Sequence, residues 1–196
     1  MGPATEFALN PTARGGRLVQ NGVFGMAIAV FVEVMLFAGF ISAFTISRSS
    51  ALPGLWPPPN QPRLPIATTA FNTAALLASG VMLFLAHRAL RGRGPEAAVR
   101  PMTAAIVLGG FFVVFQGIEW AALIRQGLTL TSSQLGSFFY VIVGAHAAHA
   151  VAALVALVLL WRALRARLAP SAFGAIQLFW YFVVLMWPVI YLRVYL

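Results

Sequence analysis

The sequence predicts an all-α membrane protein with five transmembrane helices, its N-terminus in the cytoplasm and its C-terminus outside. Hydrophobic residues make up 61% of the 196 residues and charged residues only 9%, too few polar side chains to coat a water-soluble globule. The apolar residues are gathered in five long stretches, and most arginines lie between them. Together these observations indicate a single transmembrane domain over residues 1–196.

The apolar stretches cover residues 21–46, 67–86, 102–124, 135–161 and 173–192. At a rise of about 1.5 Å per residue, each can cross a hydrocarbon core of roughly 30 Å as a helix, the longer ones when tilted. Arg14 and Arg17 precede the first stretch, as in a signal peptide, but its apolar run exceeds the roughly 7–15 residues of such a leader. We therefore expect the first stretch to be a transmembrane helix that is kept.

The segments around the helices have their own signals. Residues 49–65 form a proline-rich connection on the outer side, for which we expect a stiff polyproline-like path. The other connections are short, so successive helices should pack as neighbours. Glycines on the third and fourth stretches allow close helix approach, and Pro188 should kink the fifth.

Arginine placement predicts the orientation. All 13 basic residues are arginines. Counted by side of the membrane, nine lie with the N-terminal tail and the second and fourth connections, and four lie on the opposite side. The positive-inside rule therefore places the N-terminus in the cytoplasm. The arginines form no continuous basic face, so we expect no nucleic-acid partner.

Four ionisable residues lie inside the predicted spans, namely Glu33, Glu119, His146 and His149. Each costs roughly 2.5–3.5 kcal/mol on insertion scales, which makes them candidates for a functional site. By depth, Glu33 and His149 both fall near the middle of the membrane, so a contact between them is allowed. Glu119 and His146 both fall in the outer half of the membrane. If they face each other, each would supply the other with a hydrogen-bond partner.

Two interpretations of these residues remain open. Asn72, Gln116 and the ionisable residues can form a buried polar network that fixes helix packing. Alternatively, a carboxylate and an imidazole exchange protons across the bundle. Metal binding is disfavoured, because His87 is the only other histidine, it lies at a helix boundary, and no carboxylate is near the His146–His149 pair in sequence. The absence of cysteine excludes thiolate ligands.

The order of several motifs resembles subunit III of the haem–copper terminal oxidases, in a short five-helix bacterial form. Segment 33–39, EVMLFAG, is similar to the family's E-x-M-x-F-x-G. Segment 64–80 matches its L-P…N-T…L-L-S-S pattern, and segment 116–120, QGIEW, matches Q-x-x-E-Y. Segment 136–149 contains GSFF and GAHAAH, like G-S-x-F-F…T-G-x-H-G-x-H. The likeness extends over residues 25–196.

One segment departs from the family. The last helix usually reads W-H-F-V-D-V-V-W, whereas residues 180–187 read WYFVVLMW, so Tyr181 and Val184 replace a histidine and an aspartate. Longer relatives also have two additional N-terminal helices that wall a lipid cleft. We expect that wall to be absent here or supplied by another chain.

The resemblance implies a non-redox accessory subunit in a bacterial inner membrane. It would pack against catalytic subunit I, with subunit II in the same complex, bind phospholipid near Glu33, and support proton uptake and turnover stability. The chain would have no catalytic centre, metal or redox cofactor of its own, and haem and copper would reside in partner subunits. A nitric oxide reductase-associated relative and a small stand-alone proton or ion transporter remain alternatives, although the sequence shows no inverted repeat.

Overall fold

The computed structural model describes residues 11–51, 56, 61–168 and 171–196. Its helices are α1 (Pro11–Ser49), α2 (Ile66–Arg93), α3 (Pro95–Arg125), α4 (Gln134–Arg165) and α5 (Phe173–Ile190), and a π-helical turn, η1 (Tyr191–Tyr195), continues α5. The described residues contain five helices long and apolar enough to cross a membrane, and no strand. The predicted all-α, five-span fold class is confirmed.

Helices α1 to α4 are longer than the apolar stretches that predict them. α1 begins at Pro11, and α2 and α3 extend until only Gly94 separates them. Gly94 has φ +90°, a left-handed backbone conformation that glycine adopts without steric cost. Hydropathy marks the part of a helix that suits hydrocarbon, whereas the backbone hydrogen bonds continue into the interface. The apolar stretch therefore underestimates the helix at the arginine-rich ends.

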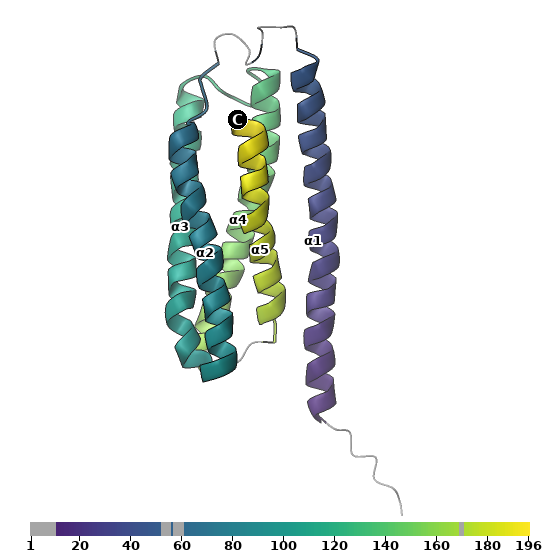
Figure 1. Cartoon of the computed structure of the whole chain (residues 1–196), viewed down its shortest axis with the longest axis vertical. Coiled ribbons are helices and arrows are strands. Elements are labelled where there is room, and N and C mark those ends of the chain that lie inside the picture. Colours follow the sequence, from purple (N-terminus) through teal and green to yellow (C-terminus); the bar gives the residue numbers. More distant parts are fainter. Residues whose placement is uncertain (1–10, 52–55, 57–60, 169–170) are drawn as a thin grey trace, which may run out of the picture.

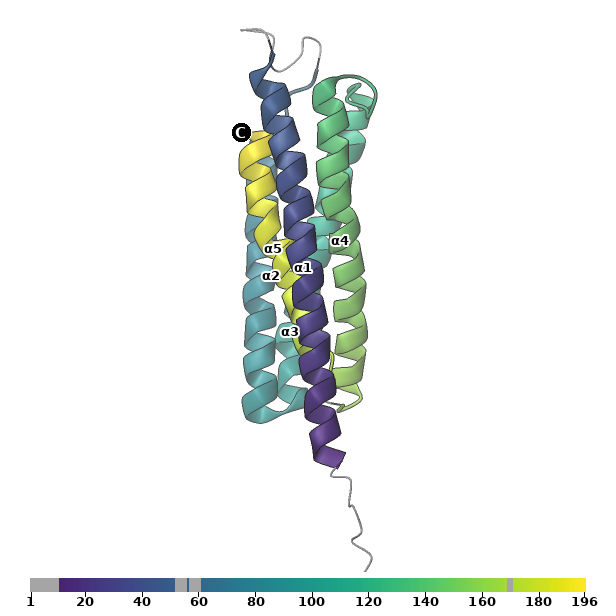
Figure 2. The ribbon, with the colours of Figure 1, turned by 90° about the vertical axis from the view of Figure 1, so that its right-hand side faces the viewer.

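α5 lies at the centre of the bundle and packs against α1, α2 and α4 (Figures 1 and 2). Consecutive helices α2 to α5 are neighbours, as expected, but α1 packs on α5 and α4 rather than on α2. α1 begins at one end of the bundle and α5 ends at the other, next to the end of α1 (Figure 1). With an odd number of spans, the chain must begin and end at opposite ends of the bundle. The cytoplasmic placement of the N-terminus stays a prediction.

Residues 52–55 and 57–60 of the predicted proline-rich connection, 49–65, lie outside the described residues, as does the N-terminal tail up to residue 10. Trp56, which is described, packs its ring on Phe44 with centroids 5.8 Å apart.

Two tryptophans of α5 fix the core. The Trp180 indole N–H donates to Ser79 Oγ at 3.1 Å, and the Trp187 indole N–H donates to Thr73 Oγ1 at 2.9 Å. Both side chains are fully buried. A Cβ on Gly109 of α3 would lie 2.6 Å from the Trp180 ring, so only glycine fits there. Large aromatic side chains on α5 are thus hydrogen bonded to α2 and seated on a backbone of α3 that lacks a side chain.

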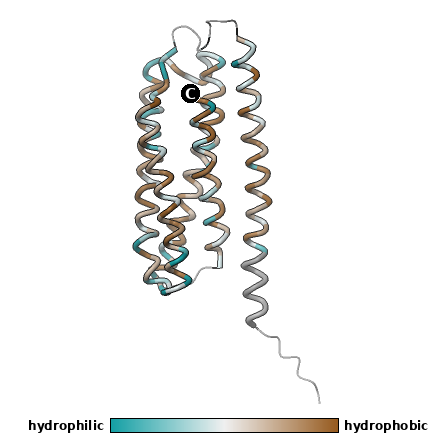
Figure 3. The backbone as a smooth tube through the Cα atoms, in the orientation of Figure 1, coloured by the Kyte–Doolittle hydropathy of each residue, from teal (hydrophilic) through white to brown (hydrophobic). Residues whose placement is uncertain are grey.

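α1 differs from the other helices in exposure. Only 6% of its most apolar window is buried, against 44% for the corresponding windows of α2 and α5–η1. Phe24, Phe31 and Met35 are each at least 60% exposed. Figure 3 shows α1 as a separate, largely hydrophobic rod beside the bundle. Most of its surface must be covered by lipid or by another protein chain.

Candidate functional site

Glu33 of α1 and His149 of α4 meet, as their membrane depth allows. His149 Nε2 lies 3.2 Å from Glu33 Oε2, and the two side chains are 22% and 31% exposed. The contact is close, although it lacks the alignment of a directed hydrogen bond. This pair joins the outlying α1 to the rest of the bundle in the middle of its length.

The partner of the other imidazole nitrogen determines what the pair can do. His149 Nδ1 lies 2.7 Å from the Ala145 carbonyl oxygen. A carbonyl only accepts, so the hydrogen-bond network assigns a proton to Nδ1. An attractive contact between Nε2 and the Glu33 carboxyl group then needs one further proton, because the Nε2 lone pair and a carboxylate repel. Such a proton would make the pair either a carboxylic acid beside a neutral imidazole or a carboxylate beside an imidazolium.

Aromatic rings enclose the His149 imidazole. The ring centroids of Phe37, Phe182 and Phe179 lie 5.8, 5.7 and 6.1 Å from it. Phe37 is fully buried. These rings make the surroundings of the contact apolar, and a low local dielectric strengthens a polar interaction between Glu33 and His149. Phe37 of α1 is the ring from the same helix as Glu33.

A second, separate polar cluster lies between α2 and α3 and includes Glu119. Both carboxylate oxygens of Glu119 accept hydrogen bonds from α2, one from the Thr68 hydroxyl and the other from the Thr69 hydroxyl at 3.0 Å. Glu119 is 8% exposed. Each oxygen of the carboxyl group therefore faces one hydroxyl of α2, although both hydroxyls also lie within hydrogen-bond distance of the Pro65 carbonyl oxygen.

The cluster continues through side-chain amides. Asn72 Nδ2 donates to the Phe112 carbonyl oxygen at 3.2 Å and to Gln116 Oε1 at 3.4 Å, and Gln116 Nε2 donates to the Tyr195 hydroxyl at 3.1 Å. All of these polar side chains are buried. We call Thr69, Asn72, Gln116, Glu119 and Tyr195 the α2/α3 network. It ties α2, α3 and the C-terminal turn η1 together.

The expected contact between Glu119 and His146 does not form. Glu119 is bonded to Thr68 and Thr69, and neither ring nitrogen of His146 has a hydrogen-bond partner among the described residues. His146 instead packs on the Trp187 ring, with centroids 5.0 Å apart. The sequence predicted this contact because the two residues lie at equal depth in the membrane. Depth, however, does not determine which neighbouring helix a side chain faces.

Sequence reasoning missed Thr68, Thr69 and Tyr195. A usable signal was present, because Thr69 precedes Asn72 by three residues and therefore shares its helix face, as Gln116 and Glu119 share theirs. Tyr195 had no such signal, since it reaches the network only through the packing of η1. Within the described residues, no three metal-ligating side chains gather at one point.

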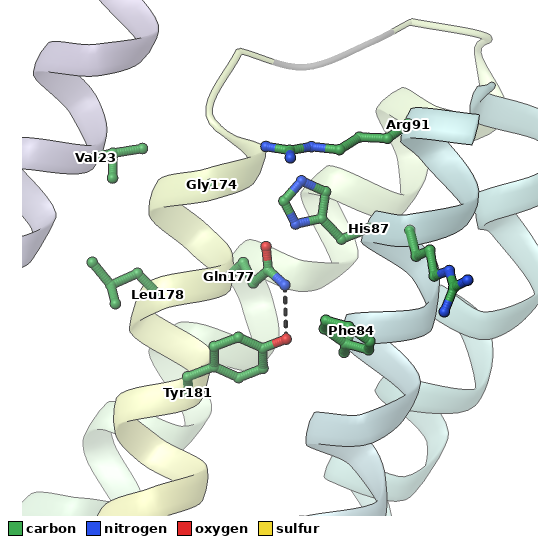
Figure 4. A pocket seen from close by; sticks show the side chains of 9 residues that line it. Val23, Phe84, His87, Arg91, Gly174, Gln177, Leu178 and Tyr181 are labelled. Atoms are coloured by element: carbon green, nitrogen blue, oxygen red, sulfur yellow. Dashed lines mark hydrogen bonds between the residues drawn. The ribbon is translucent and has the colours of Figure 1, made fainter. Parts of the chain in front are cut away.

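Figure 4 shows a cavity of about 540 Å³ between α1, α2 and α5, at the end of the bundle where α1 begins. Its walls combine apolar side chains, including Val23 and Phe84, with His87, Arg88 and Arg91 of α2. His87 and Arg91 lie toward the end of the bundle, and Gln177 and Tyr181 lie deeper in the cavity (Figure 4).

The two departures from the family motif lie on the face of α5 that packs against α2. The Tyr181 hydroxyl accepts a hydrogen bond from Gln177 Nε2 at 2.7 Å within this cavity (Figure 4). Val184 is buried, and its Cγ1 lies 3.1 Å from the position of a Cβ on Gly80. A hydrogen bond within α5 and an apolar contact with α2 therefore occupy the positions of the family's histidine and aspartate.

Comparison with known proteins agrees with these motifs. A family model described as cytochrome c oxidase subunit III matches residues 10–196. The cytochrome c oxidase subunit 3 of Pelomedusa subrufa is 32% identical over 186 residues, which cover 90% of this chain and 70% of the relative. The subunits of Gallus gallus and Sus scrofa, each also covered over 70% of its length, are 31% and 30% identical. The five apolar helices, the ordered motifs and these matches together show that the chain belongs to the cytochrome c oxidase subunit III family of multi-pass membrane proteins.

Proposed function

We propose that this chain is the non-redox accessory subunit III of a haem–copper respiratory oxidase in a bacterial inner membrane, where it packs on catalytic subunit I, alongside subunit II, and supports proton uptake and turnover stability. Membership of the subunit III family implies a complex with other oxidase subunits. Haem and copper are held by those partners, because a chain with three histidines and no cysteine lacks the ligands for two haems and a copper centre.

The Glu33–His149 pair is the observation that carries the proton role. It brings a carboxyl group within 3.2 Å of an imidazole, on a helix whose other faces are largely uncovered. A carboxyl group and an imidazole that share a proton interconvert between two forms without moving either helix. This pair can therefore pass a proton to a group presented by a neighbouring chain, which a fully bonded carboxylate such as Glu119 does poorly.

The uncovered surface of α1 supports the assembly role. Its exposed side chains are mostly large and apolar, which suits lipid and a partner helix equally. The cavity near the beginning of α1, whose walls combine Arg88 and Arg91 with apolar side chains such as Val23 and Phe84, supports binding of a phospholipid whose acyl chain runs along α1 toward the depth of Glu33. An anionic phosphate offers arginine a charge-assisted contact.

Replacement of Glu33 tests the proton role. The intact complex is purified with Glu33→Gln and, as the matched control, with Glu96→Gln, whose carboxylate pairs with Arg167 on the exposed surface at 2.8 Å. Oxygen uptake per haem and the number of turnovers before activity declines are measured across pH. We expect Glu33→Gln to keep the subunit ratio but lower turnover or shorten active lifetime, and Glu96→Gln to change neither. Unchanged activity of Glu33→Gln across pH would overturn the proton role.

The lipid role has its own test. Phospholipid that copurifies with the complex is quantified for Arg91→Gln and for the control Arg93→Gln, which removes an equal charge at the same helix end but does not line the cavity of Figure 4. We expect anionic phospholipid to be lost only with Arg91→Gln. Equal lipid content in both variants would contradict the assignment of the cavity.

A further inference from the structure

A second cavity, of about 200 Å³, lies between α3 and α4 and is distinct from the Glu33–His149 pair. Gln116, Trp120, His146 and Trp187 are among its lining residues. Gly117 and Val151 also line it and are exposed, so it opens toward the membrane-facing side of the bundle. We call it the α3/α4 crevice.

Polar atoms on the wall of the crevice have no partner. Among the described residues, neither Nδ1 nor Nε2 of His146 forms a hydrogen bond, and the same holds for Trp120 Nε1. The three atoms are buried, and His146 as a whole is 1% exposed. The other buried tryptophans differ, since Trp180 and Trp187 donate to Ser79 and Thr73. Within the described part of the chain, three of the buried polar atoms without a partner thus belong to residues that line the crevice, and the others belong to Glu33, Ser47 and Asn72.

The free-energy cost of burying these polar atoms without a hydrogen bond indicates which kind of molecule fills the crevice. A buried polar group without a partner costs about 1–3 kcal/mol, and a membrane offers no bulk water to relieve it. Ordering one water molecule costs at most about 2 kcal/mol, while one water can serve two or more polar groups. An acyl chain would fill the space without bonding to either residue. Since a water takes about 30 Å³, the crevice has room for several.

We propose that the α3/α4 crevice holds a cluster of internal water molecules that hydrogen bond to the His146 imidazole and the Trp120 indole. Gln116 lines the same crevice and belongs to the α2/α3 network through Asn72 and Tyr195. The water connects His146 to that network and, through it, to the end of the bundle that contains Glu119. His146 is thereby bonded through water in place of the expected direct contact with Glu119. This inference is independent of the proposed oxidase role.

The five tryptophans offer an internal comparison. The complex is labelled with ¹⁵N at the tryptophan indoles and histidine imidazoles, placed in lipid bilayers, and examined by solid-state NMR that follows magnetisation from water protons to each nitrogen. We expect the Trp120 and His146 signals to build up several-fold faster than those of Trp180 and Trp187, which are buried but bonded to protein. Build-up at Trp120 as slow as at Trp180 would overturn the proposal, and so would magnetisation arriving from acyl chains or a partner helix.

A pair of glycine variants locates the water. A Cβ on Gly117 meets no heavy atom within 4 Å, so Gly117→Leu fills the crevice. Gly110 has equally open surroundings on the same helix but does not line the crevice, which makes Gly110→Leu the matched control. We expect Gly117→Leu to abolish the fast build-up at Trp120 and His146 and Gly110→Leu to retain it. Retention in both variants would overturn the assignment, and the wild-type measurement decides the proposal if Gly117→Leu does not fold.

Discussion

Glu119 and Glu33 are both intramembrane carboxyl groups, but their surroundings differ. Glu119 is buried, and hydroxyl groups occupy both of its oxygens. Glu33 is 31% exposed and faces a single imidazole. A carboxyl group with all its partners in place fixes the packing of two helices, whereas one with a single titratable partner on an uncovered helix is free to exchange a proton. The same residue type therefore stabilises the fold at one site and suits a functional role at the other.

The largest effect on stability is expected for Glu119→Leu. The variant removes two hydrogen bonds and leaves the Thr68 and Thr69 hydroxyls with fewer acceptors in an apolar setting. We expect a loss of about 2–3 kcal/mol in the free energy of unfolding, because two hydrogen bonds between α2 and α3 are lost, while each hydroxyl keeps the Pro65 carbonyl oxygen as an acceptor. Unfolding of the purified protein in mixed micelles measures it. A loss no larger than that of Glu33→Leu would erase the contrast between the two sites.

Gln116→Leu should have the next largest effect. Gln116 bonds to Asn72 and Tyr195, so its loss removes one of the links between α2 and the C-terminal turn η1, while the Tyr191 hydroxyl still donates to the Ile66 carbonyl oxygen at 3.1 Å. Hydrogen bonds between membrane helices average about 0.6 kcal/mol, so we expect a loss of about 1–2 kcal/mol with turnover per assembled complex unchanged. The same unfolding assay and oxygen uptake per haem measure this. A fall in turnover with full stability would instead place the α2/α3 network in the proton path.

The Glu33–His149 pair should couple weakly in stability. In a double-mutant cycle of Glu33→Gln and His149→Phe, we expect a coupling energy of about 0.5–1 kcal/mol, since the two atoms lie 3.2 Å apart in a partly exposed setting. The unfolding free energies of the two single variants and the double variant give this value. If the losses in unfolding free energy of the two single variants add up to that of the double variant, the two side chains do not interact in the membrane.

The smallest coupling is expected between Glu119 and His146. The two residues share no direct hydrogen bond, and each has separate neighbours. The losses for Glu119→Leu and His146→Phe should therefore add to within about 0.5 kcal/mol. Coupling well above this value would revive the direct contact that equal depth suggested.

Much of the fold is predictable from the sequence. The five apolar stretches locate all five membrane-spanning helices, because each segment must satisfy its backbone hydrogen bonds internally within hydrocarbon. The helix ends were less predictable, as the single-residue connection at Gly94 illustrates. The position of α1 beside α5 and α4 was not predictable from loop length, because a long connection leaves the choice of neighbour to packing.

The candidate site was predictable as a set of residues but not as a set of contacts. Insertion cost singled out Glu33, Glu119, His146 and His149, and depth allowed the contact between Glu33 and His149 that the structure shows. The same depth argument placed His146 opposite Glu119, where the structure places Thr68 and Thr69 instead. Depth along a helix follows from residue number, whereas the facing residue depends on how each helix is rotated about its axis.

The sequence by itself determined the class of the protein, the number of spans and the family, because hydropathy and ordered motifs are properties of the chain alone. The tertiary structure decided which carboxyl group lies beside an imidazole and which lies beside two threonine hydroxyls. It also decided that His146 and Trp120 line a common crevice. These outcomes depend on helix rotation and neighbour choice, which are determined by the fit of side chains such as Trp180 against Gly109 rather than by any local pattern.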